Sequence, residues 1–218
     1  MPRNKHPEET VKKILDTSLA LFIEKGYEQT TVLDIVNNLG GLTRGAFYHH
    51  FKSKEEVLAA IFQRDEDENN FLNKALDAEV GNGLERVKYA LQLSLTASAE
   101  NPQRMAVSNL AHSLLKSPRF LAEHIQGIKA DSHRLAALLD EGMKDGSIKQ
   151  GNPLHIAELF MLLANLWMMP NLFPSSKEDA VAKVKMIEQI FAGLGYDFIE
   201  GELTQLYIGL LDELHEDV

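Results

Sequence analysis

The sequence predicts an all-α protein in which an N-terminal helix-turn-helix precedes a larger helical region. Apolar residues recur every three to four positions along the 218 residues, and no stretch alternates with period two. Residues 31–54 read as two short helices around a glycine turn. About ten helices are expected, separated by glycine and proline breaks. These breaks fall at Gly81–Gly83, Asn101–Pro102, Ser117–Pro118, Gly146–Pro153, Pro170–Ser176 and Gly193–Gly195.

The first expected helix ends at Gly26 and has one apolar stripe. The stripe follows the i, i+3, i+4 spacing of a helix that packs one face on a core. It consists of Val11, Ile14, Leu15, Leu19, Phe22 and Ile23. We expect this helix to support the two short helices that follow.

The second helix begins at Thr31, whose hydroxyl can cap it, with Asp34 at the capping-box position. Gly40 and Gly41 follow this helix and can adopt the positive φ that ends it and turns the chain sharply. The apolar stripe between cap and turn consists of Val32, Ile35, Val36 and Leu39.

The third helix separates its side chains into two arcs at about 100° per residue. One arc, expected to pack inward, contains Ala46, Phe47 and His50; the other, expected to face outward, contains Arg44, Gly45, Tyr48 and His49. A guanidinium in the first turn can bind guanine O6 and N7, and a glycine lets the backbone approach a groove closely. Tyrosine and histidine can bind phosphate oxygens or base edges.

The next helix begins with Ser53 as cap and Glu56 at the capping-box position. Lys54 then lies at a helix N-terminus, where the dipole and the ammonium together favour a phosphate. The helix from Thr31, the glycine turn, the following helix with its polar outer face and the lysine together predict a helix-turn-helix. In this motif the later of the two helices, here the one that contains Arg44, lies in the DNA major groove.

Charge and composition narrow the class of protein. The net charge is −10, but residues 1–54 contain eight Lys/Arg against six Asp/Glu, so the acidic excess lies in residues 55–218. We therefore expect DNA binding with a marked salt dependence. The absence of Cys excludes disulfides, cysteine nucleophiles and Cys-based zinc sites. With no apolar signal segment at the N-terminus, we expect a cytoplasmic protein.

Residues 11–54 resemble the TetR family of transcriptional regulators over about the first quarter of the chain. The matching residues are Ile14–Leu15, Leu21–Phe22, Lys25–Tyr27, Thr30–Thr31, Asp34–Val36 and Thr43–Lys54. The resemblance implies a homodimer with an N-terminal three-helix DNA-binding domain (residues 1–54, linked through the helix starting at 54). It also implies a larger helical ligand-binding and dimerisation domain (residues 55–218). Members of this family are mostly repressors that a small molecule releases from a near-palindromic operator.

The resemblance also implies which residues contact DNA. Phosphate contacts are expected from Thr31, Tyr48 and Lys54, and the residues expected nearest the bases are Thr43, Arg44, Gly45 and His49. The sequence departs from the family in two places. Gly40-Gly41-Leu42 makes the turn one residue longer than usual, and Leu33 stands where a basic or polar residue is common.

The most apolar run, residues 159–169, has eleven residues and contains Asn165. It is too short for a membrane span, which needs about 20 residues. An all-round apolar helix is buried on every side, in the core, at a subunit interface or along a ligand pocket, and we favour packing over ligand contact. By family analogy, helices near 153–169 and 178–193 form the dimer interface.

The effector pocket is poorly marked in the sequence. The candidates for its lining are apolar or aromatic residues on helices: Met105, Phe120, Phe160 and Trp167. The histidines at 112, 124 and 133 are scattered, so no metal site and no cofactor are expected.

Two other functions were weighed against a ligand-responsive repressor. A helical enzyme is disfavoured because the sequence has no Gly-rich phosphate loop, G-x-S-x-G, HExxH or recognisable catalytic carboxylate pair. A DNA-binding protein without a small-molecule effector stays open. The effector, the operator and the sign of regulation are not encoded in any motif.

Overall fold

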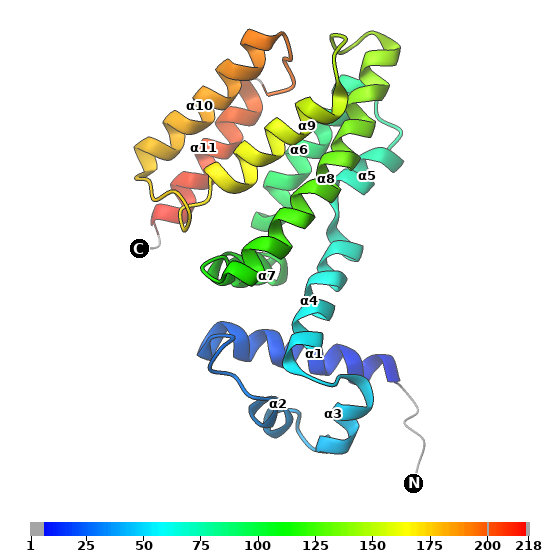
Figure 1. Ribbon diagram of the computed structural model, residues 1–218, viewed down its shortest axis with the longest axis vertical. Helices are drawn as coiled ribbons and strands as arrows, with labels where there is room; N and C mark the ends of the chain where they lie inside the picture. The colour runs from blue at the N-terminus through cyan, green and yellow to red at the C-terminus, as the bar shows by residue number, and fades with distance from the viewer. Residues whose placement is uncertain (1–6, 200, 217–218) are drawn as a thin grey trace. The chain divides into compact units, whose positions relative to one another are not determined.

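The computed structural model describes residues 7–199 and 201–216 (Figure 1). Within these residues all the regular secondary structure is helical. The predicted all-α class is therefore confirmed. In chain order the helices are α1 (Pro7–Lys25), α2 (Val32–Asn38), α3 (Arg44–His50), α4 (Lys54–Asn69), α5 (Phe71–Asp77), α6 (Gly83–Glu100), α7 (Pro102–Leu114), α8 (Pro118–Asp145), α9 (Pro153–Leu162), the π-helix η1 (Leu163–Trp167), α10 (Lys177–Leu194) and α11 (Gly201–Glu216).

By its internal contacts the chain divides into two compact units. The first contains the chain up to Asn69 together with Gln103–Leu110, and the second contains Asn70–Pro102 and the chain from Ala111 onward. Helix α4 thus packs with the first unit. The functional division predicted at residue 54 is a separate matter and stays a prediction.

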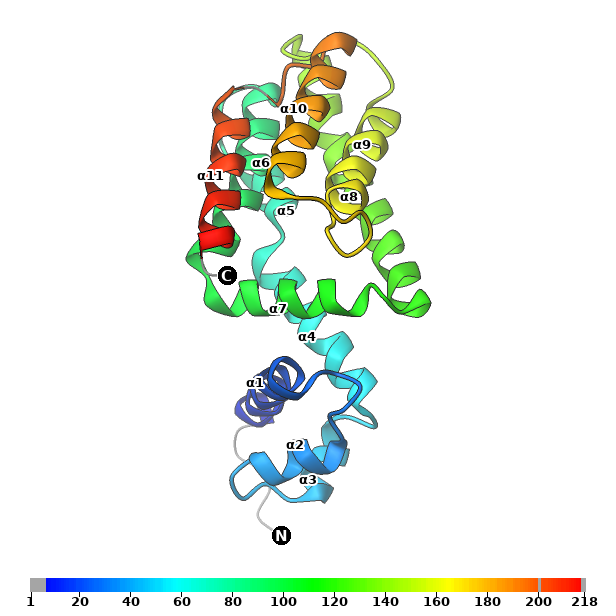
Figure 2. The same ribbon diagram turned by 90° about the vertical axis from the view of Figure 1, so that its left-hand side faces the viewer.

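The first unit is built on α1, which packs against α4 and α2, while α2 packs against α3. Figure 2 shows α2 and α3 side by side, with α1 seen nearly end-on. The largest fully buried side chains of this unit are Ile14, Phe22, Ile35, Leu39, Phe47 and Ile61. Residues from all four helices fill this core, so α2 and α3, each only seven residues long, depend on tertiary packing for their stability.

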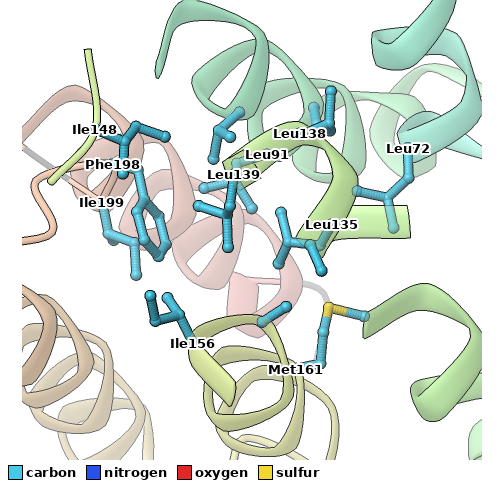
Figure 3. Packing of buried hydrophobic residues seen from close by; sticks show 14 of the residues in the cluster. Leu72, Leu91, Leu135, Leu138, Leu139, Ile148, Ile156, Met161, Phe198 and Ile199 are labelled. Atoms are coloured by element: carbon cyan, nitrogen blue, oxygen red, sulfur yellow. The ribbon is translucent and has the colours of Figure 1, made fainter. Parts of the chain in front are cut away.

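The second unit is organised around the 28-residue helix α8, which packs against α9, α6 and α5, while α11 packs against α10 and α6. Figure 3 shows Leu135, Leu138 and Leu139 of α8 within the core, and all three are fully buried. The start of α6 approaches the end of α8 so closely that a Cβ on Gly83 would lie 2.2 Å from the backbone nitrogen of Gly142. Only glycine at position 83 permits this approach.

The structure has a helix break that the sequence does not predict. The first break expected after residue 54 is at Gly81, but α4, which contains the acidic run 65–68, ends at Asn69 and α5 begins at Phe71. The buried side chain of Asn70 accepts a hydrogen bond from the Asn73 N–H at 2.8 Å and caps the new helix. Asparagine favours a helix cap over a helix interior, so a local bond overrides the continuous helical pattern.

The apolar run 159–169 also differs from expectation. Leu159 and Leu162 are 39% and 44% exposed, so in the single chain this segment is not buried on every side. After α9 the helix widens into η1, and the Asn165 side-chain amide donates to the carbonyl of Met161 at 3.0 Å. This side-chain bond reaches the carbonyl four residues earlier, at the point where the helix changes register.

Candidate nucleic-acid interface

The predicted glycine turn connects α2 to α3. Gly40 and Gly41 have φ of 56° and 96°, the left-handed region that favours glycine. The Thr43 hydroxyl then caps α3, accepting the Ala46 N–H at 3.2 Å. The predicted glycine turn is confirmed, while the cap at Thr43 is a feature that was not predicted from the sequence.

The two faces of α3 are divided as the sequence predicts. Phe47 is fully buried, and Ala46 and His50 are half-buried. The opposite face exposes the side chains of Arg44, Tyr48 and His49 together with Gly45. This exposed face is polar and lies at the surface of the unit.

Arg44 and Tyr48 contact each other on that face. The guanidinium carbon of Arg44 lies 5.4 Å from the centre of the Tyr48 ring. The Tyr48 ring in turn meets the buried ring of Phe47 edge-on, with centroids 5.5 Å apart. A guanidinium that rests on a supported ring loses less side-chain freedom when it binds a partner.

No steric constraint within the described protein requires glycine at position 45. A Cβ at this position would have its nearest described neighbour, Thr43 Oγ1, at 3.7 Å, which is ordinary contact distance. Its backbone is also not among those with positive φ. An alanine would therefore fit the free protein, and the lack of a side chain matters only to something that approaches α3 from outside.

Thr31 caps α2 through a complete capping box. Its hydroxyl accepts the Asp34 N–H at 3.1 Å and donates to Asp34 Oδ2 at 2.6 Å, and its own N–H donates to the same oxygen at 2.8 Å. The carboxylate also accepts a hydrogen bond from Lys25 Nζ at 2.8 Å. The phosphate contact predicted for Thr31 would require its hydroxyl to turn from this carboxylate.

The Lys25 ammonium and the Thr31 donors hold the pKa of Asp34 well below its ordinary value of 3.8. The lowered pKa means that the ionised carboxylate stabilises the folded state above the pKa of the unfolded chain. This contribution is lost only as the pH falls through the lower folded-state pKa. The start of α2 is therefore held at neutral pH.

Lys54 lies at the first turn of α4, where a phosphate contact is predicted. In the structure its ammonium donates to the carbonyls of Tyr27 and Glu28, at 2.9 and 3.2 Å. It also lies 4.4 Å from the centre of the Tyr27 ring. The sequence predicts a functional role for Lys54 but not these partners, because a backbone carbonyl has no sequence signature.

The cap of α4 is only partly as expected. The Ser53 hydroxyl accepts the Glu56 N–H at 3.3 Å, as an N-cap does. The Glu56 carboxylate, however, accepts the N–H of Lys52 at 2.6 Å, which is one residue before the position that a capping box uses.

The four predicted effector-contacting residues are not brought together as one group. Met105 is 38% exposed and belongs to the first unit, whereas Phe120, Phe160 and Trp167 belong to the second. Phe160 packs edge-on against Phe191, with centroids 5.7 Å apart. Trp167 is half-buried beside Lys183, whose ammonium donates to its carbonyl at 3.1 Å.

A groove of about 530 Å³ lies within the first unit, on α1, α4 and the ends of α3 and α7. None of the predicted effector residues lines it. Its lining consists of Pro7, Glu8, Val11, Lys12, Leu15, His50, Arg64, Glu68 and Gln103.

Two pairs of polar residues that are far apart in the sequence contact each other in the second unit, His124 with Asn165 and Asn171 with His112. The His124 ring nitrogen Nε2 lies 3.2 Å from the Asn165 carbonyl, and the Asn171 amide donates to the His112 carbonyl at 2.9 Å. Burial lowers the pKa of His112, and the neighbouring His124 lowers it further. Among the residues that the structure describes, no group of three or more His, Cys, Asp or Glu is arranged to hold a metal ion.

Comparison with known proteins shows the family of the chain. Residues 14–61 match the family model of the bacterial regulatory proteins of the tetR family. The HTH-type transcriptional regulator TtgW of Pseudomonas putida is 31% identical over 103 residues, which are 47% of this chain and 72% of TtgW. The chain belongs to the TetR family. Its relatives are regulators rather than enzymes.

Longer and more distant matches agree with this assignment. The HTH-type transcriptional repressor KstR2 of Rhodococcus jostii (strain RHA1) is 29% identical over 187 residues, 78% of this chain and 84% of KstR2. The structure of SmeT in complex with triclosan shares the fold, with a TM-score of 0.63, 23% identity, and coverage of 84% of this chain and 91% of that one. The chain spans only 34% to 66% of the length of several other curated relatives.

Within the described residues, no helix of this TetR-family chain has the length and apolar character needed to cross a membrane.

Proposed function

We propose that this regulator is a homodimeric repressor that binds a near-palindromic operator and is released from it by a small molecule. The observation that carries the proposal is the division of α3, with Phe47 buried and Arg44, Tyr48 and His49 exposed. A helix so divided can enter the major groove without losing its packing. Two such helices in a dimer would occupy successive grooves, about 34–36 Å apart.

The proposed DNA contacts fall into two groups. Thr43, Arg44, Gly45 and His49 would lie nearest the bases, while Thr31 and Tyr48 would bind phosphate oxygens. Support comes from exposure, since each of these six residues is exposed in the unbound chain. Lys54 differs from them because it is half-buried, and its ammonium, like the Thr31 hydroxyl, is bound within the protein.

Gly45→Ala separates folding from DNA binding. We expect the variant to be as stable as the wild type or more stable by about 0.5–1 kcal/mol, because alanine favours a helix and its Cβ meets only an ordinary contact with Thr43 Oγ1. We expect its operator affinity to fall at least tenfold, because the new methyl group occupies the face that approaches the groove. Thermal unfolding and DNA titration measure the two effects. Unchanged DNA affinity would mean that α3 does not approach DNA through Gly45.

The proposed dimer interface is an apolar surface on α9 and α10. Leu159 and Leu162 on α9 and Met186 and Leu194 on α10 are 39% to 51% exposed. Exposed apolar side chains on neighbouring helices are typical of a subunit interface. These residues lie in or beside the predicted segments 153–169 and 178–193.

Met186→Glu tests this surface. A charge buried in an apolar interface lacks a partner, so we expect the variant to dissociate at concentrations at least tenfold higher than the wild type. Sedimentation equilibrium measures the dissociation, and Gln126→Glu on an exposed site of α8 is the control for added charge. Equal dissociation constants for wild type and both variants would place the interface elsewhere.

The proposed effector site lies in the region from residue 55 to 218, and DNA binding in residues 1–54. Phe120, Phe160 and Trp167 are apolar residues of the second unit, and His124, which neighbours His112, adds a polar group beside η1. The SmeT complex with triclosan supports a small-molecule effector for a protein of this fold. Met105 is the weakest candidate because it is exposed in the first unit.

The first experiment is to select genomic DNA fragments with the purified protein at low salt and to sequence those retained. Enrichment of a near-palindromic motif is the expected result, and genes beside the motif indicate which compounds to test for release. Enrichment without release by any compound in a metabolite and drug screen would favour a regulator that responds to another protein. No enrichment would contradict the proposed operator.

A further inference from the structure

Hydrogen bonds from the side chains of Thr30, Lys25 and Lys54 hold the loop between α1 and α2. The Thr30 hydroxyl lies within hydrogen-bond distance of the carbonyls of Gly26 and Leu21, at 2.9 and 3.2 Å, between which its single O–H is shared, and Thr30 is almost fully buried. Lys25 reaches across the loop to Asp34. The third bond set comes from Lys54, which is 27 residues from Tyr27 in the sequence.

The Lys54 ammonium joins α4 to this loop. It donates to the Tyr27 and Glu28 carbonyls at 2.9 and 3.2 Å, and the same Tyr27 carbonyl accepts the Thr30 N–H at 3.3 Å. The Tyr27 ring, which is 5% exposed, lies beneath the ammonium and packs edge-on against Phe22. The contact therefore joins a buried ring, two carbonyls and the first turn of α4.

A lysine ammonium has three N–H donors. Two of those of Lys54 are directed into the protein, so a phosphate could take only the third or would have to displace a carbonyl. Breaking these bonds leaves two carbonyls near the C-terminal end of α1 without a cation, which is unfavourable at that end of a helix. The geometry thus favours an internal role over a backbone contact.

We propose that Lys54 is a positioning residue that fastens the Tyr27–Glu28 carbonyls to α4 and thereby fixes where α2 begins at Thr31. It acts on DNA recognition through α2 and α3 and does not itself bind a phosphate. The inference rests on the proposed DNA binding by α3, but its first test needs no DNA.

Hydrogen exchange of the full-length protein tests the fastening. Lys54→Met keeps the length of the side chain and removes its donors, so amides from residue 27 to 34 are expected to exchange at least tenfold faster. Lys54→Arg supplies two N–H groups and a cation for the Tyr27 ring, so it is expected to restore most of the protection. Lys52→Met, at an exposed site two residues away, is the charge-matched control and is expected to exchange like the wild type. Wild-type exchange rates in Lys54→Met overturn the proposal.

The salt dependence of DNA binding separates positioning from phosphate contact. A lost phosphate contact lowers the slope of log affinity against log salt by about 0.9. We expect Lys54→Met to weaken operator binding about tenfold at every salt concentration with an unchanged slope, and Lys54→Arg to bind like the wild type. A slope lowered by about 0.9 in Lys54→Met overturns the proposal. If the wild type binds no operator, the proposed function fails, while the exchange experiment still decides the role of Lys54.

Discussion

Replacing Phe47 with alanine is expected to lower the free energy of unfolding of the first unit by about 3–5 kcal/mol. Phe47 is fully buried, and its ring packs against Phe51 with centroids 6.2 Å apart. Alanine leaves a cavity beneath α3, which is only seven residues long and cannot hold its conformation without tertiary contacts. We therefore expect operator binding to be lost together with the packing.

The single tryptophan makes this result measurable. Trp167 belongs to the second unit, so its fluorescence follows that unit, whereas circular dichroism follows all the helices. In Phe47→Ala the helices of the first unit should melt at a lower temperature, so the circular dichroism transition should begin earlier. The fluorescence transition, which follows the second unit, should stay nearly unchanged. Phe173→Ala removes the same ring from a 48% exposed site and should change stability by about 0.5 kcal/mol or less. Equal stability of Phe47→Ala and wild type would contradict the packing of α3.

The features predicted correctly from the sequence depend on interactions a few residues apart. The Thr31 capping box, the Gly40–Gly41 turn and the Ser53 hydroxyl cap all involve groups within a few residues of one another. The two arcs of α3 follow from helical periodicity alone. Such patterns can be recognised without knowing what the rest of the chain does.

The features that were missed depend on one side chain competing with the helical pattern. Asn70 caps a new helix where no break is predicted between residue 54 and Gly81, and Asn165 lies in η1, where its side-chain amide donates to the carbonyl of Met161. Asparagine occurs in helices, caps and loops, so its identity alone does not say which bond it makes.

Contacts between distant segments were beyond the sequence for a different reason. Lys54 reaches carbonyls 26 and 27 residues away, and backbone groups leave no mark in the sequence. The predicted effector residues were chosen by side-chain type, which cannot tell that Met105 lies in one unit and Phe160 in the other. Choosing among them requires the fold.

Arg44 carries the most specific of the proposed DNA contacts. It lies in the first turn of α3, is exposed, and rests on the Tyr48 ring. A bidentate pair with guanine O6 and N7 contributes about 1–3 kcal/mol of discrimination between bases. Arg44→Ala is therefore expected to weaken operator binding by about 5- to 150-fold, since about 1.4 kcal/mol corresponds to a factor of ten.

A base contact and a phosphate contact by Arg44 predict different patterns of loss. If Arg44 reads a base, Arg44→Ala loses much more affinity for the operator than for random DNA, and Arg44→Lys, which keeps the charge without the planar fork, loses nearly as much operator affinity. If Arg44 binds a phosphate, both DNAs lose similar affinity and lysine substitutes well. Competition titrations with the two DNAs at one salt concentration measure the difference.

The decisive measurement uses operators altered at one base pair at a time. Wild-type protein should discriminate strongly at a guanine in each half-site, and Arg44→Ala should lose discrimination at that base pair while keeping it elsewhere. The affected base pair reports where α3, which follows the Gly40–Gly41 turn, lies in the groove. Discrimination that is unchanged at every base pair would mean that the longer turn holds Arg44 away from the bases, so that Tyr48, His49 or Thr43 must read the sequence instead.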